Sequence, residues 1–243
     1  MEIKIVDDLI TTIKSEMLVK DVRQGPFQTA VLTDKCGLAS TPYSYTYRHG
    51  DLPVKEAGNL IGKRALEAVK MVYSSSQFVA AIGMAMINSL IEIPEESCVH
   101  LNAGDLLAEQ GKNRKVALVG HFPFVPKLRR IVKELWVIEQ NLQEGDLTED
   151  KAGIFLPQAE VIGITGSAFT NHTIDYLIGL CRPEAYVIVL GPTTPLSPIL
   201  FNYGVNAVSG TMVVNPEAVL RCVSQGATFR QIEGIQMLTI KRD

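Results

Sequence analysis

Residues 186–198 read Tyr186-Val187-Ile188-Val189-Leu190-Gly191-Pro192-Thr193-Thr194-Pro195-Leu196-Ser197-Pro198. The first five are aromatic, β-branched or aliphatic, which predicts a buried strand. The prolines that follow cannot extend this strand, because each fixes φ and removes a donor of the ladder. Gly191 allows a close backbone approach, while Thr193, Thr194 and Ser197 bring hydroxyl groups to the end of the strand. In a parallel α/β sheet that end holds ligands, so the stretch predicts the floor of a small-molecule site.

Strand and helix patterns alternate around this stretch, from residue 109 to the end of the chain. The expected strands are Lys115–Val119, Leu135–Glu139, Glu160–Thr165, Ala185–Leu190, Val205–Ser209 and a final Gln236–Lys241. The expected helices are Phe124–Glu134, Asn171–Cys181, Pro195–Tyr203 and Pro216–Gln225. Such alternation predicts a doubly wound parallel sheet of Rossmann-like type.

The first part of the chain, residues 1–108, shows strands and then helices, which is typical of an α+β domain. An amphipathic helix opens it, with Ile3, Val6, Ile10, Ile13 and Met17 on one face. The expected strands are Leu18–Val22, Thr29–Leu32 and Leu38–Thr41, followed by a polar loop at Tyr43–Leu52 and helices at Gly62–Tyr73 and Gln77–Glu92. A polar, glycine-containing bridge at Asn102–Arg114 joins the two parts.

The overall charge and hydropathy argue against several classes of protein. A net charge of −3 gives no basic field for nucleic acid. The longest apolar stretch, Phe78–Leu90, is too short to span a bilayer. Acids at Glu2, Asp7 and Asp8 do not fit a signal peptide, so we expect a cytoplasmic protein.

The four cysteines are far apart in the sequence and form no metal-binding spacing. We expect them to be buried, reduced thiols that pack as small hydrophobic groups.

The loop after the first strand of the second part, Gly120-His121-Phe122-Pro123, has one glycine where a dinucleotide fingerprint has three. Ordinary NAD binding is therefore disfavoured. Glu139 ends the second strand, where an acid can accept from the ribose hydroxyls of a nucleotide or S-adenosylmethionine. The alternative, a solvated acid at a strand end, is equally compatible with the sequence.

The loop after the third strand, Thr165–Thr173, combines Gly166 with several hydroxyl groups. Thr170 or Asn171 is expected to cap the helix that follows. Together these groups predict a receptor for an anion or a carboxylate. Ser209-Gly210 after the fifth strand repeats the pattern of small residues with hydroxyl groups.

His121 and His172 suggest a metal site, whose ligand atoms would have to lie about 2.0–2.3 Å from the ion. In the strand order 3-2-1-4-5 their strands would be two spacings, roughly 9–10 Å, apart. We therefore interpret both first as polar pocket groups and second as metal ligands.

The loop at Gly191–Pro198, with Leu200-Phe201 and Gly204-Val205 after it, resembles the family described as putative heavy-metal chelation. Further residues that look like motifs of this family are Gly120, Phe122, Pro123, Glu139, Ile164, Thr165, Gly166, Ser167, Asn171, Asp175 and the segments Thr29–Leu32 and Gly37–Ala39. The resemblance covers nearly the whole chain. It implies an enolase-N-terminal-like α+β domain at residues 1–108, a Rossmann-like domain at 109–243, and a site in the cleft between them.

Three functional hypotheses follow. The first is a protein, catalytic or not, that handles a divalent metal or a metal-chelating small molecule in the interdomain cleft. The second is a transferase that uses S-adenosylmethionine or a related nucleoside. The third is a non-catalytic interaction protein that forms a homodimer through its small domain. We expect neither nucleic acid nor a membrane as a partner.

The predicted ligand-binding residues are Gly120, His121, Phe122, Pro123, Glu139, Thr165, Gly166, Ser167, Asn171, His172, Gly191, Pro192, Thr193, Thr194, Pro195, Ser209 and Gly210.

Overall fold

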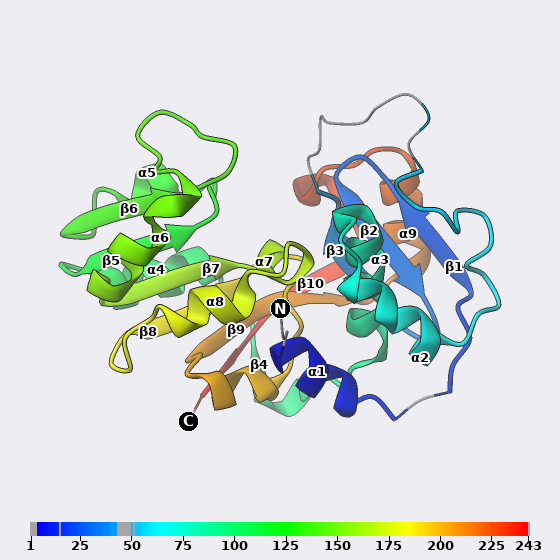
Figure 1. The fold of residues 1–243 in the computed structure, drawn as a ribbon. Coiled ribbons are helices and arrows are strands. Elements are labelled where there is room, and N and C mark those ends of the chain that lie inside the picture. The colour runs from blue at the N-terminus through cyan, green and yellow to red at the C-terminus, as the bar shows by residue number, and fades with distance from the viewer. Residues whose placement is uncertain (1–3, 15, 43–49, 51, 243) are drawn as a thin grey trace.

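The computed structural model describes residues 4–14, 16–42, 50 and 52–242. Within them the strands form one sheet of seven strands and one of three (Figure 1). In spatial order the large sheet consists of β4 (Cys98–Val99), β10 (Ile235–Lys241), β9 (Ala207–Val213), β8 (Tyr186–Leu190), β7 (Val161–Thr165), β5 (Lys115–Val119) and β6 (Glu134–Ile138). The small sheet consists of the antiparallel strands β1 (Asp21–Gln24), β2 (Gln28–Leu32) and β3 (Cys36–Ser40). The predicted α/β fold class is confirmed.

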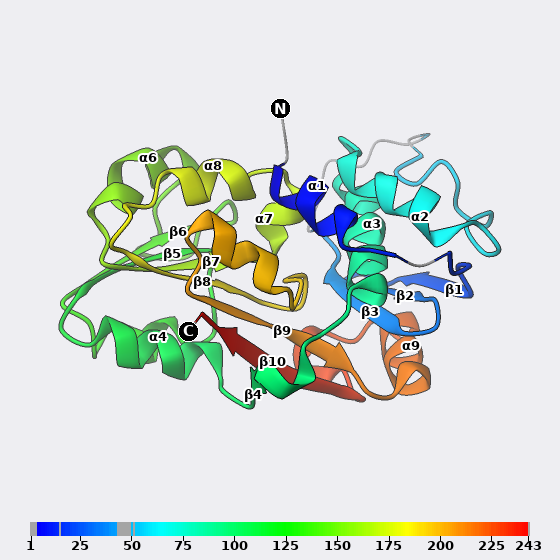
Figure 2. The same ribbon diagram turned by 90° about the horizontal axis from the view of Figure 1, so that it is seen from below.

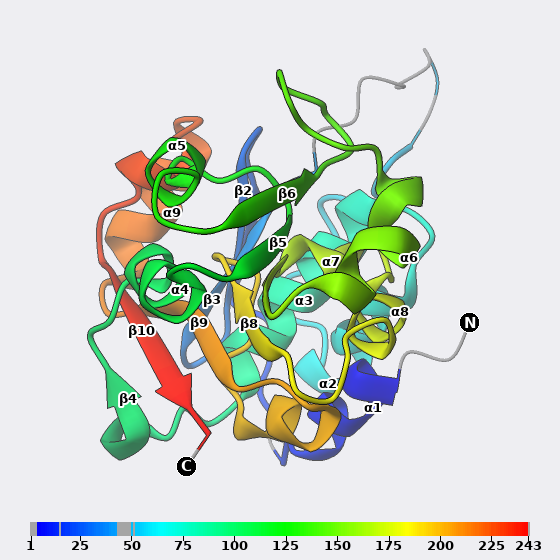
Figure 3. The same ribbon diagram turned by 90° about the vertical axis from the view of Figure 1, so that its left-hand side faces the viewer.

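The five strands from β6 to β9 are parallel, and β10 and β4 pair antiparallel at one edge. Most side chains of the parallel strands are buried, which explains their runs of valine, isoleucine and leucine. The sheet twists along its length from β6 to β4 (Figure 3).

The order of the parallel strands differs from the order considered above. Numbered along the chain, they lie as 2-1-3-4-5, so the first and third strands are direct neighbours: β5 pairs with β7 from Val116 opposite Val161 to Val119 opposite Ile164. The expected gap of two strand spacings between them is wrong. Hydrophobic periodicity predicts where a strand occurs in the sequence, but the strands that lie beside it are determined by packing across the whole sheet.

Helices cover both faces of the large sheet (Figure 2). On one face lie α4 (Ala103–Gly111) and α5 (Val125–Leu128), which bury leucine side chains against the strands. On the other face lie α6 (Ala152–Phe155), α7 (Ser167–Thr170) and α8 (Ile174–Gly179). Short 3-10 turns at Glu95–Ser97, Glu149–Lys151, Leu156–Gln158, Pro198–Tyr203 and Phe229–Gln231 (η2 to η6) connect these elements.

The small sheet is enclosed by helices from opposite ends of the chain. α3 (Gln77–Leu90), preceded by α2 (Ala65–Ala68) and η1 (Val69–Tyr73), packs on one face of β2 and β3. α9 (Pro216–Ser224), which lies between β9 and β10 in sequence, packs on β1 and β2. Gly37 of β3 permits the close approach of α3, because a Cβ there would lie 2.1 Å from the carbonyl oxygen of Ala85. Segments from the N-terminal and the C-terminal parts of the chain therefore pack together around the small sheet.

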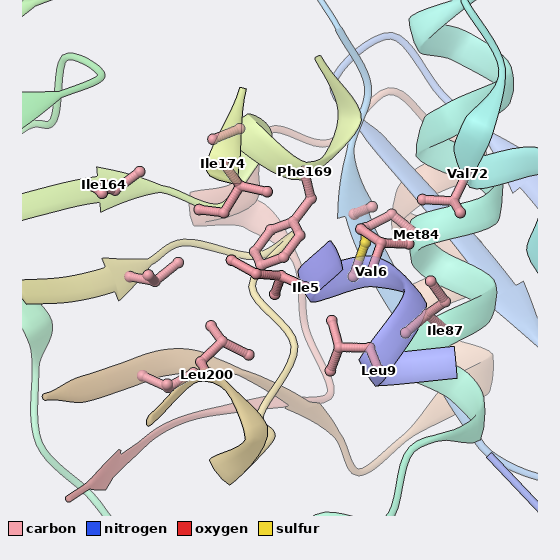
Figure 4. Close-up of a cluster of buried hydrophobic side chains, with 14 of the residues drawn as sticks. Ile5, Val6, Leu9, Val72, Met84, Ile87, Ile164, Phe169, Ile174 and Leu200 are labelled. Atoms are coloured by element: carbon pink, nitrogen blue, oxygen red, sulfur yellow. The ribbon is translucent and has the colours of Figure 1, made fainter. Parts of the chain in front are cut away.

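The N-terminal helix α1 (Lys4–Thr11) joins the two parts of the molecule. Its buried residues Ile5, Val6 and Leu9 share one hydrophobic cluster with α3 and with Phe169 of α7 (Figure 4). Phe169 is completely buried beside Ile5 in this cluster. The core thus runs without interruption from the small sheet to the large one.

Several predicted elements differ from the observed ones. The predicted bridge at residues 102–114 contains α4, since Asn102 caps a helix by accepting from the Gly104 N–H. The segment from residue 124 to 134 is helical only over α5, and the one from 195 to 203 contains the 3-10 turn η5 from Pro198 onward instead of an α-helix. The buried face of α1 consists of Ile5, Val6 and Leu9, while Ile10 is only partly buried. Ile3 and most of the predicted loop at 43–52 lie outside the described residues.

Three elements pack across the predicted boundary between residues 108 and 109. β4 and α4 begin before it and pack on the large sheet, and α9 lies after it and packs on the small sheet.

Candidate functional site

A cavity of about 710 Å³ opens where the carboxyl ends of β5 and β7 meet. From β5 the chain crosses to β6 on one side, and from β7 it crosses to β8 on the other, so these two ends mark the switch point of the doubly wound sheet. The small part of the molecule forms the opposite wall, to which it contributes Phe27, Gln28, Ser40, Thr41, Pro42 and Gln77. The cavity therefore lies between the two sheets.

The loop after β5 forms part of the cavity floor. Gly120, His121 and Phe122 line it, whereas Pro123 does not. Gly120 has a φ of +105°, and a Cβ on it would lie 3.0 Å from the Cβ of Thr165. Glycine at this position therefore lets the ends of β5 and β7 lie side by side.

Glu139 lines the cavity just beyond the end of β6, as the sequence suggests for a ligand-binding acid. Its carboxylate accepts three backbone N–H groups, from His121 at 2.8 Å, Gln140 at 2.8 Å and Asn141 at 3.0 Å. These bonds hold two loops in place and occupy most of the lone pairs that a ribose would use. Ribose binding by Glu139 stays a prediction.

His121 forms a pair with Asp146, a residue that the sequence analysis missed. The imidazole Nδ1 lies 2.8 Å from Asp146 Oδ2 and 3.1 Å from Oδ1, and the Asp146 side chain has no exposed surface. Asp146 lies in the polar loop between β6 and α6, which carries no motif. Only the fold brings the two residues together.

The loop after β7 contributes Thr165, Ser167 and Asn171 to the cavity. Asn171 Oδ1 accepts from the N–H and hydroxyl groups of Thr173, and the helix α8 starts only after Thr173. The expected cap at Thr170 or Asn171 is therefore wrong by two or three residues. Gly166 does not line the cavity, because the backbone of Thr194 packs against it.

His172 lies apart from His121 and does not line the cavity. Its φ of +61° turns the side chain so that Nε2 donates to the Val72 carbonyl at 2.7 Å. It thereby connects the loop after β7 to η1 of the small part. In the part of the chain that the structure describes, no group of three or more His, Cys, Asp or Glu side chains could hold a metal ion.

The loop after β8 does not line the cavity. Thr193 and Thr194 are each 1% exposed, and Thr193 Oγ1 accepts the Ser40 N–H at 2.9 Å. The Thr193 carbonyl accepts from Asn88 Nδ2 at 3.1 Å, so this loop joins β3 and α3 to the large sheet. The remaining predicted residues of this region, none of which lines the cavity, are Gly191, Pro192, Pro195, Ser209 and Gly210.

Gln28 lines the cavity and is another residue that the sequence analysis missed. It is 4% exposed, and its Oε1 is buried without a hydrogen-bond partner among the described residues. A glutamine directly before the expected strand Thr29–Leu32 is a usable signal, because buried polar side chains are nearly always hydrogen-bonded.

The charged groups around the cavity are mostly acidic. Glu139, Glu149 and Asp150 line it together with His121, and neither lysine nor arginine does so among the described residues. Hydroxyl and amide side chains make up much of the remaining surface, with the rings of Phe27, Phe122 and Phe229. Such a surface suits a neutral or cationic molecule with many hydrogen-bonding groups better than a phosphate.

None of the helices in residues 4–14, 16–42, 50 and 52–242 is long and apolar enough to cross a membrane.

Comparisons with known proteins agree with the fold. Two family models, both described as "Putative heavy-metal chelation", match residues 6–91 and 102–242. A solved structure of a protein of unknown function from the DUF364 family of Desulfitobacterium hafniense is 27% identical, covers 98% of each chain and superimposes with a TM-score of 0.88. A second one, from Pyrococcus horikoshii, is 20% identical over 98% of each chain with a TM-score of 0.81, and it supports the fold.

An uncharacterized protein of Methanocaldococcus jannaschii is 25% identical over 167 residues, which span 66% of this chain and 64% of that relative. The family models together match most of the chain, and one of them alone matches more than half. The chain therefore belongs to the family described as "Putative heavy-metal chelation".

Proposed function

We propose that this protein binds a small organic molecule in the cavity between its two sheets, and that this molecule, rather than the protein, supplies the donor atoms for a metal ion. The observation that carries the proposal is the buried, unpartnered Oε1 of Gln28 in the cavity wall. Leaving such an acceptor unpaired costs about 1–3 kcal/mol, and a donor group of the ligand, or a water bound with it, supplies the missing partner.

The side chains present do not fit direct coordination of a heavy metal. Soft metals prefer thiolate and imidazole ligands. Burial raises the pKa of the Cys36 and Cys181 thiols to about 12, and no cysteine lines the cavity among the described residues. The oxygens of Glu139 and the Nδ1 of His121 already take part in hydrogen bonds within the protein. Nε2 of His121 is free, but no group of three or more His, Cys, Asp or Glu side chains among the described residues could complete a metal site. The protein's own contribution is therefore to bind and orient an organic ligand.

The lining indicates the chemistry of that ligand. Hydroxyl groups of Ser40, Thr41, Thr165 and Ser167 offer hydrogen bonds from both walls. Because Glu139, Glu149 and Asp150 line the cavity and no lysine or arginine does so among the described residues, a phosphorylated ligand would be repelled. A neutral or cationic compound with several donors fits best, and a nucleoside without phosphate groups belongs to this class.

Native mass spectrometry of untagged protein, with elemental analysis of the same sample, tests the proposal. We expect a retained organic mass, and metal only in samples that retain it. In Gln28→Leu the retained mass should dissociate about tenfold more readily, since one hydrogen bond of about 1 kcal/mol or more is lost. The ligand-free variant should be more stable than the ligand-free wild type in urea, because the unpaired acceptor is gone.

Gln110→Leu in α4, away from the cavity, is the matched control and should leave both properties unchanged. Metal that stays bound after the organic mass has been removed would contradict the proposal. A Gln28→Leu variant that binds the molecule as tightly as the wild type would do the same.

A further inference from the structure

The Asp146–His121 pair has the geometry of an oriented base. The imidazole of His121 is 18% exposed and lines the cavity, whereas the Asp146 carboxylate beneath it is completely buried. Both carboxylate oxygens lie within hydrogen-bond distance of Nδ1. An ionised carboxylate only accepts hydrogen bonds, so the proton of the neutral imidazole resides on Nδ1. Nε2 then carries a lone pair, and no described residue forms a hydrogen bond with it.

The surrounding backbone holds this pair in position. The His121 N–H donates to Glu139 Oε2, and the Gln143 N–H donates to Asp146 Oδ2 at 3.0 Å. Gly120, directly before His121, packs against Thr165 of the neighbouring strand. His121 is thus held in place both by the hydrogen bond of its backbone N–H and by the hydrogen bond of its ring. A side chain that only lines a pocket does not require this degree of positioning, whereas a catalytic group does.

We propose that His121 is a catalytic base that acts on the molecule bound in the cavity, and that Asp146 is its positioning residue. The inference rests on the proposed function, since it requires a ligand in the cavity. Nε2 takes a proton from an O–H or N–H group of the ligand, whose heavy atom keeps the electron pair. The imidazolium that forms is stabilised by the negative charge of Asp146.

His172 provides a contrast within the same molecule. Its Nε2 is bonded to the Val72 carbonyl and therefore carries a proton instead of a free lone pair. The acids that share the cavity with His121 are Glu139, Glu149 and Asp150. Glu139 is held by three N–H groups, Glu149 accepts from Gln140, and Asp150 bonds to Thr148 and Lys151. Among the described charged or titratable residues that line the cavity, His121 thus combines a ring nitrogen without a hydrogen-bond partner with a second nitrogen bonded to a buried carboxylate.

An active ester, p-nitrophenyl acetate, probes the Nε2 lone pair without knowledge of the natural ligand. Nε2 attacks the acetyl carbon, and p-nitrophenolate leaves with the electron pair. Water then hydrolyses the acetylimidazolium, which returns the neutral imidazole and releases acetate and two protons to the solvent. We expect the wild type to release p-nitrophenolate about 100-fold faster than His121→Gln at neutral pH, the lower end of what a positioned base contributes. Asp146→Asn should also be slower, and peptide mass mapping should find the acetyl group on His121.

His100→Gln is the matched control, because His100 is exposed and outside the cavity, and its reaction rate should equal that of the wild type. Should Asp146→Asn fail to fold, ¹⁵N NMR of histidine-labelled wild type tests whether Asp146 positions His121. We expect the proton of the His121 ring on Nδ1. A proton on Nε2, or equal rates for wild type and His121→Gln, overturns the inference. A retained organic molecule beside an unreactive His121 overturns this inference alone. A reactive His121 in a protein that binds no organic molecule contradicts the proposed function and supports the base.

Discussion

At the scale of single residues, Thr194 shows that the loop after β8 packs tightly against the large sheet. The backbone of Thr194 lies between Gly166, which directly follows β7, and Gly210 of β9. A Cβ on Gly166 would be 2.6 Å from Thr194 N, and one on Gly210 would be 2.6 Å from Thr194 O. Both distances are far below normal contact. Glycine at these two positions therefore creates the space in which the loop after β8 is seated.

We expect Gly166→Ala and Gly210→Ala to destabilise the protein by about 1–3 kcal/mol each, the usual cost of overpacking a well-packed core. Urea unfolding measures this loss. Gly179→Ala at the end of α8 is the control, because an added Cβ there would meet no atom within 4 Å. It should be neutral or stabilising by about 0.4–1 kcal/mol. Equal stability of Gly166→Ala and Gly179→Ala would contradict the prediction, because it would show that the loop after β8 moves to accommodate the added methyl group at little cost in free energy.

At the scale of elements, α1 depends on bonds to three separate parts of the chain. Asp8 accepts from the hydroxyl of Tyr203 in η5, and Asp7 accepts from that of Tyr73 in η1. At the start of the helix, the Ile5 N–H donates to Asp175 of α8 at 3.3 Å. A helix of eight residues is too short to be stable alone, so these bonds and its buried face determine where it forms.

The hydrogen bond to Asp8 raises the pKa of Tyr203 to about 12 from an ordinary value of 10.0. A tyrosine whose pKa is higher in the folded state contributes stability below pH 10.0, and this contribution is lost as the pH rises to about 12. Tyr203→Phe should therefore be less stable at neutral pH, and its difference from the wild type should shrink across this alkaline range. Chemical unfolding at a series of pH values measures it. Tyr176→Phe, at an exposed tyrosine, should follow the wild-type curve throughout. A difference for Tyr203→Phe that does not depend on pH would contradict the assignment.

At the scale of the whole molecule, the two sheets share one continuous hydrophobic core. α9 completes the small sheet from the C-terminal part of the chain, and α1 carries residues of the N-terminal part into the core beside the large sheet. The loop after β8 adds hydrogen bonds to β3 and α3. Neither sheet can be removed without exposing the core of the other, and the cavity between them depends on both.

We expect a single unfolding transition, with the same midpoint by the fluorescence of Trp136, the only tryptophan, and by far-UV circular dichroism. Phe169→Ala should lower the free energy of unfolding by about 3–5 kcal/mol, the usual cost of removing a fully buried ring. Both probes should shift together, although Trp136 lies in β6 and Phe169 lies in α7, beside α1. Separate transitions in the wild type would show two independently folding domains.

The sequence by itself determined the class of the fold and the position of most strands, because burial in a parallel sheet imposes long apolar runs that can be recognised locally. It also identified the loops after β5 and β7 and Glu139, all at the switch point. Only the tertiary structure decided that β5 lies beside β7, that Asp146 holds His121, and that Gln28 faces the same cavity. It also placed the proline-rich loop after β8 in the core instead of the cavity. These are contacts between residues distant in sequence. They depend on which elements pack together, and a local pattern of hydrophobic and polar residues does not specify which elements become neighbours.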